Sequence, residues 1–340
     1  MHMTNVGSRE RISYIDSLKG YAICLVVLGH LIQSWYCPGT SKGNIIFNYI
    51  CAFHMPLFML LSGFTTRTHE NFSSLLDGIW RRSIALLLPF FAWGLTRAIC
   101  FNGISISQQI YNPDCGLWFL WSLFFIYVCF HTCMFLGKSL FSNKHKYLFL
   151  LFGWIFLILI RVILDGKYGS SSIMYYFVYF SLGYILANSS IYDKIINNCK
   201  SILAICLICF LICGYIMYGT YHLSTLFSLK LSLKIMMYPI YSFIAICGCL
   251  ASFSFFYIFD RHLKFLYLNQ LGKITLGIYA VHFSILSYFH QTYNELIFPS
   301  VPLLNYVVSF LFVLLLSIAI VYIMSKTRIT SILYLGKGYK

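Results

Sequence analysis

Long runs of apolar residues, separated by short polar segments, follow one another along almost the whole chain. A helix of roughly 20 residues crosses the hydrocarbon core of a bilayer, and most of these runs reach that length. Every backbone N–H and C=O in hydrocarbon needs a partner within the protein, so such runs form helices. We predict about ten membrane-spanning helices, with ends accurate to about two to four residues. The predicted spans are 17–36, 45–66, 79–101, 116–137, 147–164, 171–188, 201–219, 232–258, 274–293 and 302–324.

Lys and Arg residues are unevenly divided between the two sets of loops that connect these runs. The loops of one set, together with both chain ends, hold most of them. Only Lys42, Lys167, Lys230 and Lys234 fall in or beside the loops of the other set. Because basic loops stay in the cytoplasm, both termini are predicted to be cytoplasmic, as an even number of spans requires.

Composition excludes a soluble domain. Hydrophobic residues make up 60% of the chain and charged residues 10%, and the mean hydropathy is +0.79; ordinary globular proteins are about 25% charged. The net charge of +15 suits loops that face an anionic leaflet better than a nucleic-acid surface. Most of the 13 Cys lie inside apolar runs, as small buried hydrophobes do, and we predict neither a disulfide framework nor a metal site.

The chain is predicted to be one domain, residues 1–340, an all-α polytopic bundle embedded in a membrane. Residues 1–16 are polar and offer no cleavable signal peptide. All loops are short, no internal repeat is evident, and the tail after Met324 is expected to be a basic cap.

Polar groups inside predicted spans are functional candidates, because hydrocarbon does not solvate them. His30 lies about 20 Å from the cytoplasmic edge of the first span at 1.5 Å per residue. Lys19 precedes it by eleven residues, or three turns plus about 20°, so both occupy one face. Asp16 can pair with Lys19 at the i,i+3 spacing. A histidine here is either a general base or a packing residue bonded to a neighbouring helix.

Two other spans carry histidines. His54 lies beside Pro56, which frees the carbonyl of Ala52, so His54 either satisfies loose backbone groups or faces the His30 cavity. Ser62, one residue before Gly63, permits close helix approach near the cytoplasmic end. Tyr279 and His282 are three residues apart on one face of the ninth span, a spacing that is more often structural than catalytic.

Adjacent arginines, Arg81 and Arg82, open the third span at its cytoplasmic end. Such a pair commonly orients the helix or contacts lipid headgroups. Guanidinium groups also grip phosphates by bidentate hydrogen bonds. Arg97 and Arg161 lie near the outer ends of their spans and are expected to snorkel outward, although Arg97 could instead line an outer cavity.

Four separated motifs resemble the acyltransferase 3 family of membrane proteins, which includes polysaccharide O-acetylases and fucose 4-O-acetylase-like proteins. The first runs from IDSLKG at 15–20 to His30, and the second covers 53–64. The third joins Arg81-Arg82 to 88–90 and to GLWFL at 116–120, and the fourth is 271–282. The motifs occur in the family's order and extend the resemblance over essentially the whole chain.

The resemblance implies transfer of an acyl group, typically acetyl from acetyl-CoA as co-substrate, onto a hydroxyl of a glycan or lipid-linked sugar. It implies His30 as general base, with Asp16 and Lys19 in the same catalytic group, and a donor site at Arg81 and Arg82. Lys19 and Arg82 would guide the anionic CoA from the cytoplasm. The implied cavity-lining residues are His54, Ser62, Trp118, Tyr279 and His282. No permanently bound cofactor and no nucleic acid are expected.

Two features depart from the family pattern. Lys19 stands where the family usually has Arg. Its ammonium group is a point charge, whereas a guanidinium can form bidentate hydrogen bonds. The family's R-x-x-R is here Arg81-Arg82-Ser83-Ile84, without the spaced second arginine.

The depth of His30 relative to the arginine pair suggests that the acyl group crosses the bilayer to an acceptor outside. The expected location is the inner membrane of a bacterium. A glycan exporter or other secondary transporter is the alternative, although such proteins usually show repeated halves with paired broken helices. Tyr111, Asn112 and Asp114 in the outer loops have the chemistry of sugar contacts.

Overall fold

The computed structural model describes residues 13–36, 44–100, 105–113, 117–140, 147–219, 231–260, 262, 267–295 and 302–337. Within these residues every regular element is a helix, so the prediction of an all-α polytopic membrane protein is confirmed. The α-helices are α1 (Ser13–Leu31), α2 (Ile45–Phe64), α3 (Phe72–Arg82), α4 (Leu88–Cys100), α5 (Ile106–Tyr111), α6 (Trp118–Leu140), α7 (Leu148–Ile163), α8 (Ser170–Ala187), α9 (Ile191–Asn197), α10 (Cys199–Gly214), α12 (Leu231–Phe259), α13 (Leu268–Leu271), α14 (Thr275–Glu295), α15 (Pro302–Met324) and α16 (Arg328–Leu335).

A helix stands at each of the ten predicted spans. Seven of the ten, within the described chain, are long and apolar enough to cross a membrane; α7 and the apolar part of α14 are shorter, and α8, at the predicted span 171–188, is in neither group. Three π-helical turns extend or join α-helices: η1 (Ile32–Tyr36), η3 (Ser83–Leu87) and η5 (Tyr215–Gly219). Hydropathy alone does not reveal such turns, which frequently mark functional sites.

The third span begins earlier than predicted. Helices α3 and α4, joined by η3, form one apolar segment over Phe72–Ile99, whereas the apolar run suggested a start at residue 79. Asn71 caps α3: its side chain accepts the backbone N–H of Ser74, and the Ser74 hydroxyl lies 3.4 Å from the Asn71 backbone nitrogen. This capping box fixes the start of a helix whose first turns are too polar for a hydropathy criterion.

The tail after Met324 contains more than the basic cap that we predicted. It forms α16, which packs on α4: the Trp93 indole N–H donates to the Tyr334 carbonyl at 3.1 Å, and the hydroxyls of Tyr334 and Thr96 are 2.9 Å apart. Gly336, in the left-handed region at φ +61°, ends the helix. A side chain there would collide with the carbonyl oxygen of Ala85, so this contact requires glycine.

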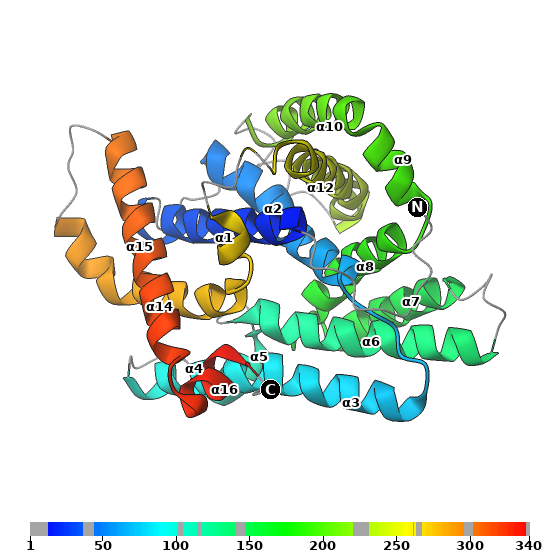
Figure 1. Ribbon diagram of the computed structural model, residues 1–340, viewed down its shortest axis with the longest axis horizontal. Coiled ribbons are helices and arrows are strands. Elements are labelled where there is room, and N and C mark those ends of the chain that lie inside the picture. The colour runs from blue at the N-terminus through cyan, green and yellow to red at the C-terminus, as the bar shows by residue number, and fades with distance from the viewer. Residues whose placement is uncertain are drawn as a thin grey trace.

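Helices α1 and α2 lie at the centre of the bundle, with α14 and α15 on one side, α10 and α12 on another, α8 alongside α2, and α6 packed against α8 (Figure 1). Close backbone approach fixes the contact between α2 and α8. A Cβ built on Gly63 would lie 1.9 Å from the carbonyl oxygen of Phe180, and one on Gly183 would lie 1.9 Å from that of Leu60. Small residues at facing positions let α2 and α8 touch backbone to backbone, as membrane helices commonly do.

A second close approach joins the first and fourth motifs. A Cβ on Gly272 would lie 1.9 Å from the carbonyl oxygen of Asp16, and one on Gly20 would lie 2.0 Å from that of Leu268. The short helix α13 therefore packs directly against the first half of α1. Residues more than 240 positions apart in the chain thus form one structural unit at this end of the bundle.

Candidate active site

A polar cavity of about 160 Å³ lies where α1, α2, α6 and α8 meet the α3–η3 segment. Its lining residues are Lys19, Ser62, Thr65, Arg82, Leu86, Leu123, Tyr127 and Phe180. Arg82 and Thr65 are exposed, so the cavity lies at the surface of the end predicted to be cytoplasmic. Two cations share this small space, an arrangement that suits an anionic group.

The cavity unites three residues predicted from separate motifs: Lys19, Ser62 and Arg82. The Ser62 hydroxyl donates to the Phe58 carbonyl at 2.8 Å, which leaves its oxygen lone pairs free to accept. Arg81 is exposed and is not among the lining residues, because consecutive residues of a helix point about 100° apart. Asp16 is 7% exposed and lies at the contact with Gly272; its pairing with Lys19 stays a prediction.

Tyr127 and His69 belong to this site and escaped the sequence analysis. The guanidinium carbon of Arg82 is 5.1 Å from the centroid of the Tyr127 ring. The Tyr127 hydroxyl lies 2.9 Å from His69 Nε2. A Cβ on Gly78 would lie 2.4 Å from His69 Cε1, so the glycine in α3 makes room for the imidazole. The Arg82 guanidinium is therefore held against a tyrosine that is itself tethered.

His69 lies in the loop between α2 and α3, where the pKa of its imidazole is lowered by burial and, secondarily, by the charge of Lys138. The Lys138 ammonium is 3.5 Å from the His69 carbonyl oxygen. His69 is therefore neutral near pH 7 and can exchange a neutral hydrogen bond with Tyr127. His131 of α6 packs beside it, with ring centroids 4.8 Å apart, and its Nε2 is 3.2 Å from the Thr66 hydroxyl.

A cluster of histidines lies further along α1. His30 is half-buried, with its ring centroid 5.3 Å from that of His282 and 6.0 Å from that of Phe283. His30 also interacts electrostatically with His54 and His282. The structure thus brings together three histidines that were predicted from three motifs. At 1.5 Å per residue, Lys19 and His30 are about 16 Å apart along α1.

Backbone carbonyls orient two of these rings. His54 Nδ1 lies 2.6 Å from the Ile50 carbonyl oxygen, and His282 Nδ1 lies 3.0 Å from that of Ile278. A carbonyl oxygen only accepts, so each Nδ1 carries the proton and each Nε2 of a neutral ring is an acceptor. His54 does not bond the Ala52 carbonyl that Pro56 frees, so it is not explained as a repair of that break.

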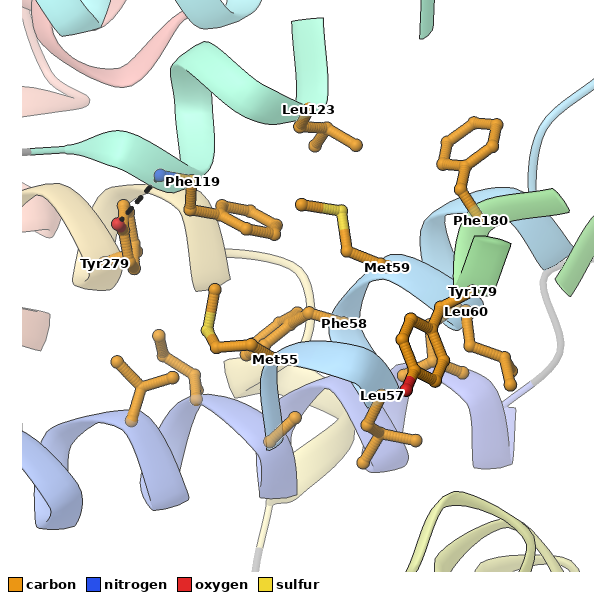
Figure 2. Packing of buried hydrophobic residues seen from close by; sticks show 14 of the residues in the cluster. Met55, Leu57, Phe58, Met59, Leu60, Phe119, Leu123, Tyr179, Phe180 and Tyr279 are labelled. Atoms are coloured by element: carbon orange, nitrogen blue, oxygen red, sulfur yellow. Dashed lines mark hydrogen bonds between the residues drawn. The ribbon is translucent and has the colours of Figure 1, made fainter. Parts of the chain in front are cut away.

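Tyr279 and Trp118 occupy different surroundings. The Tyr279 hydroxyl accepts the backbone N–H of Phe119 at 3.3 Å (Figure 2). The Tyr279 ring centroid is 5.8 Å from that of His282. Trp118 stacks on Tyr176 of α8 at 5.3 Å and 26°. Tyr279 therefore belongs to the histidine cluster, whereas Trp118 contacts α8.

An aromatic layer separates the cavity from the histidines. Phe58 lies one turn before Ser62 on α2, and Phe119 lies one turn before Leu123 on α6. The Phe119 ring centroid is 5.7 Å from that of Phe58 and 5.3 Å from that of Tyr279. Met55 and Met59 pack with these rings, and all are buried (Figure 2).

Arg97 lies near the histidine cluster. Its guanidinium carbon is 5.8 Å from the centroid of the Phe283 ring, and that ring contacts His30. Of the two expectations for Arg97, this contact with α14 favours a position inside the bundle over one that snorkels outward.

Among the residues that the structure describes, no three His, Cys, Asp or Glu side chains are grouped so that they could hold a metal ion. Of the outer-loop candidates, Tyr111 packs against the segment before α8: its ring lies 5.3 Å from the Lys167 ammonium, and its carbonyl accepts the Tyr168 N–H at 2.8 Å. Asn112 is exposed beside it. Asp114 lies outside the described residues.

Comparison with protein families decides the class of the chain. The model of the acyltransferase 3 family, described as an acyltransferase domain, matches residues 12–326. This range includes both the cavity and the histidine cluster.

The chain belongs to the acyltransferase 3 family. The family is one of membrane acyltransferases, and seven helical segments of the described residues are long and apolar enough to span a membrane, as the motifs and apolar runs suggested. Among characterised proteins, it is similar to nodulation protein NolL of Mesorhizobium japonicum, with 31% identity over 133 residues that cover 36% of each chain. It is also similar to nodulation protein NolL of Sinorhizobium fredii, with 30% identity over 130 residues, 35% of this chain and 36% of the relative. The chain thus spans about a third of these relatives. No solved structure matches it.

Proposed function

We propose that this acyltransferase moves an acyl group, most simply acetyl, from acyl-CoA to a hydroxyl of a cell-surface glycan or lipid-linked sugar. One observation carries the proposal: a single helix, α1, contributes Lys19 to a cavity with two cations and His30 to a cluster of histidines. A site for an anionic donor and a site for proton transfer are thus joined by one rigid element.

Lys19 and Arg82 bind phosphate oxygens of the CoA in the proposed reaction. A cavity of about 160 Å³ admits only part of that large molecule, so its nucleotide end lies on the surface around the exposed Arg82 and its pantetheine arm points inward, towards His30. The Tyr127 ring supports the guanidinium, and Ser62 and Thr65 add hydroxyl groups. These contacts rest on charge-assisted hydrogen bonds, the strong class in proteins.

His30 serves as the general base. A sugar hydroxyl attacks the thioester carbonyl while the imidazole takes its proton, which contributes roughly 10²–10⁴-fold to the rate. The C–O bond forms, the C–S bond breaks with its electron pair on sulfur, and the imidazolium returns the proton to the thiolate. The products are the O-acyl ester and free CoA.

The acyl group has to pass the aromatic layer to reach His30 from the cavity. Acetyl and the narrow, unbranched end of the pantetheine arm that carries it follow a path among Phe58, Phe119 and the flexible side chains of Met55 and Met59. We therefore propose that donor and acceptor meet the enzyme from opposite faces of the membrane, taken to be the inner membrane of a bacterium.

Sealed proteoliposomes with the enzyme in one orientation test this function. Radiolabelled acetyl-CoA is supplied to one face and glycan from the native surface to the other. We expect labelled glycan only when acetyl-CoA faces the cavity side, and mass spectrometry of the surface glycan should show acetyl esters that disappear on gene deletion. Product formed only with both substrates on one face would refute the crossing; unlabelled glycan under all arrangements would refute the function.

A further inference from the structure

His282 contains a buried acceptor that has no partner. Its side chain is 1% exposed, and its Nε2 is enclosed by protein without a hydrogen bond. Because Nδ1 donates to the Ile278 carbonyl, Nε2 of the neutral ring must be the acceptor. A buried polar atom without a partner is costly and is uncommon unless it has a functional role.

Two titratable rings of the described residues pack against it, Tyr279 at 5.8 Å between ring centroids and His30 at a shorter distance. The ring centroids of His30 and His282 are 5.3 Å apart, with the planes tilted by 43°. A ring nitrogen lies slightly more than 1 Å from its centroid, so two facing nitrogens at this separation approach to about 3 Å, which is hydrogen-bond distance. The contact needed is one in which the half-buried His30 ring rotates so that its Nε2 meets that of His282.

The other nitrogen of His30 lies on the open side. His30 Nδ1 is 3.2 Å from the amide oxygen of Gln33, in an exposed contact between the end of α1 and η1. The oxygen and nitrogen of an amide are exchanged by a simple flip, so Gln33 can equally present its NH₂ to Nδ1. In that arrangement Gln33 occupies the place of a hydroxyl donor.

We propose that His282 is a positioning residue for the base. Its Nε2 accepts the Nε2–H of His30 and thereby fixes the tautomer in which the lone pair of His30 is on Nδ1, towards the exposed side. This inference rests on the proposed function and assigns the base nitrogen within it. The acceptor hydroxyl displaces Gln33, gives its proton to Nδ1, and the same proton later passes from Nδ1 to the CoA thiolate.

Other groups near the pair leave this role to His282. His54 of α2 interacts with His30 electrostatically and has its own carbonyl partner. Tyr279 of α14 accepts the Phe119 N–H through its hydroxyl and keeps its own O–H as a donor, so it supplies no fixed acceptor for His30. Arg97 of α4 lies over Phe283 and supplies positive charge but no acceptor. These are the titratable and charged groups whose protonation could contribute to the pH profile of kcat.

Two substitutions separate positioning from packing. His282→Phe keeps a ring and removes the acceptor, whereas His282→Gln keeps an acceptor oxygen. With acetyl-CoA and native glycan, we expect His282→Phe to lower kcat by roughly 10²-fold, in the lower range for loss of proton-transfer catalysis, with an unchanged KM for acetyl-CoA. We expect His282→Gln to recover at least about a tenth of wild-type kcat, and the pH profile of kcat to shift only in His282→Phe.

The tautomer provides a readout that does not depend on activity. Nitrogen-15 NMR of histidine-labelled enzyme in nanodiscs, with the His30 signal assigned by His30→Gln, should show Nε2–H in wild type and in His282→Gln, and a mixture in His282→Phe. An unchanged tautomer and unchanged kcat in His282→Phe overturn the proposal. Equal losses of kcat in both variants with an unchanged tautomer also overturn it, in favour of packing. The expected tautomers in a protein that acylates no glycan would refute the proposed function and leave the pair intact.

Discussion

The two ends of α1 meet side chains of different kinds. At one end, Lys19 and the exposed Arg82 present long, flexible cations to a cavity at the surface. Eleven residues away, His30 meets His282, a ring that is buried and tied to a backbone carbonyl. Long side chains adapt to a ligand, whereas fixed rings hold one geometry for proton transfer. The contrast suggests that the first end governs donor affinity and the second governs the chemical step.

The largest effect is expected from His30→Gln. The amide cannot take a proton from the attacking hydroxyl, so kcat should fall by roughly 10²–10⁴-fold while the KM for acetyl-CoA stays within about twofold. Steady-state kinetics with acetyl-CoA and native glycan measure both constants. A matched loss of acetyl-CoA binding in the same variant would contradict the separation of the two ends.

A smaller effect, on the KM for acetyl-CoA and not on kcat, is expected at the end of α1 that carries Lys19. Arg82→Gln or Lys19→Gln removes one charge-assisted contact of about 1.5–3 kcal/mol, so the KM for acetyl-CoA should rise roughly 10- to 100-fold with little change in kcat. Arg81→Gln removes the same charge outside the cavity and serves as the matched control, with an expected change below about threefold. If Arg81→Gln matched Arg82→Gln, the effect would arise from general surface charge.

The smallest effect tests how Arg82 is held. In Gly78→Ala the new methyl would meet His69 Cε1 at 2.4 Å, so the imidazole should move away from the Tyr127 hydroxyl. Arg82 then loses a tethered neighbour, and we expect the KM for acetyl-CoA to rise a few-fold, within the roughly 1 kcal/mol of one hydrogen bond.

The single variant His69→Gln and the double variant His69→Gln/Gly78→Ala complete a double-mutant cycle with Gly78→Ala. The two substitutions should be non-additive, because each disturbs the same contact. Strict additivity of their effects on KM would show that Gly78 acts elsewhere.

The sequence predicts helix positions and site residues well when a single helix or a single motif determines them. Ten apolar runs mark ten helices, and the 3.6-residue period correctly placed Tyr279 beside His282. Motif resemblance selected Lys19, Ser62 and Arg82, which converge from three helices on one cavity.

What could not be predicted depends on contacts between distant segments. Tyr127 is one of 27 tyrosines and lies in an apolar run, so nothing in the pattern distinguishes it until His69 is found 58 positions away. The sequence also does not reveal that His282 Nε2 is buried without a hydrogen-bond partner, because only tertiary packing determines what surrounds a ring. Helix α16 was missed because it is short and is stabilised by its contacts with α4.

The reciprocal contacts of Gly63 and Gly183 have a mechanical consequence. With no side chain between their backbones, α2 and α8 cannot slide past each other or rotate independently, so they move as one rigid unit. Any widening that admits a passing acyl group must therefore come from displacement of α6, whose Phe119 meets Phe58 of α2 through side chains. A disulfide that tethers α6 to α2 across Phe58 and Phe119 should then arrest turnover, whereas one between α2 and α8 should leave it intact.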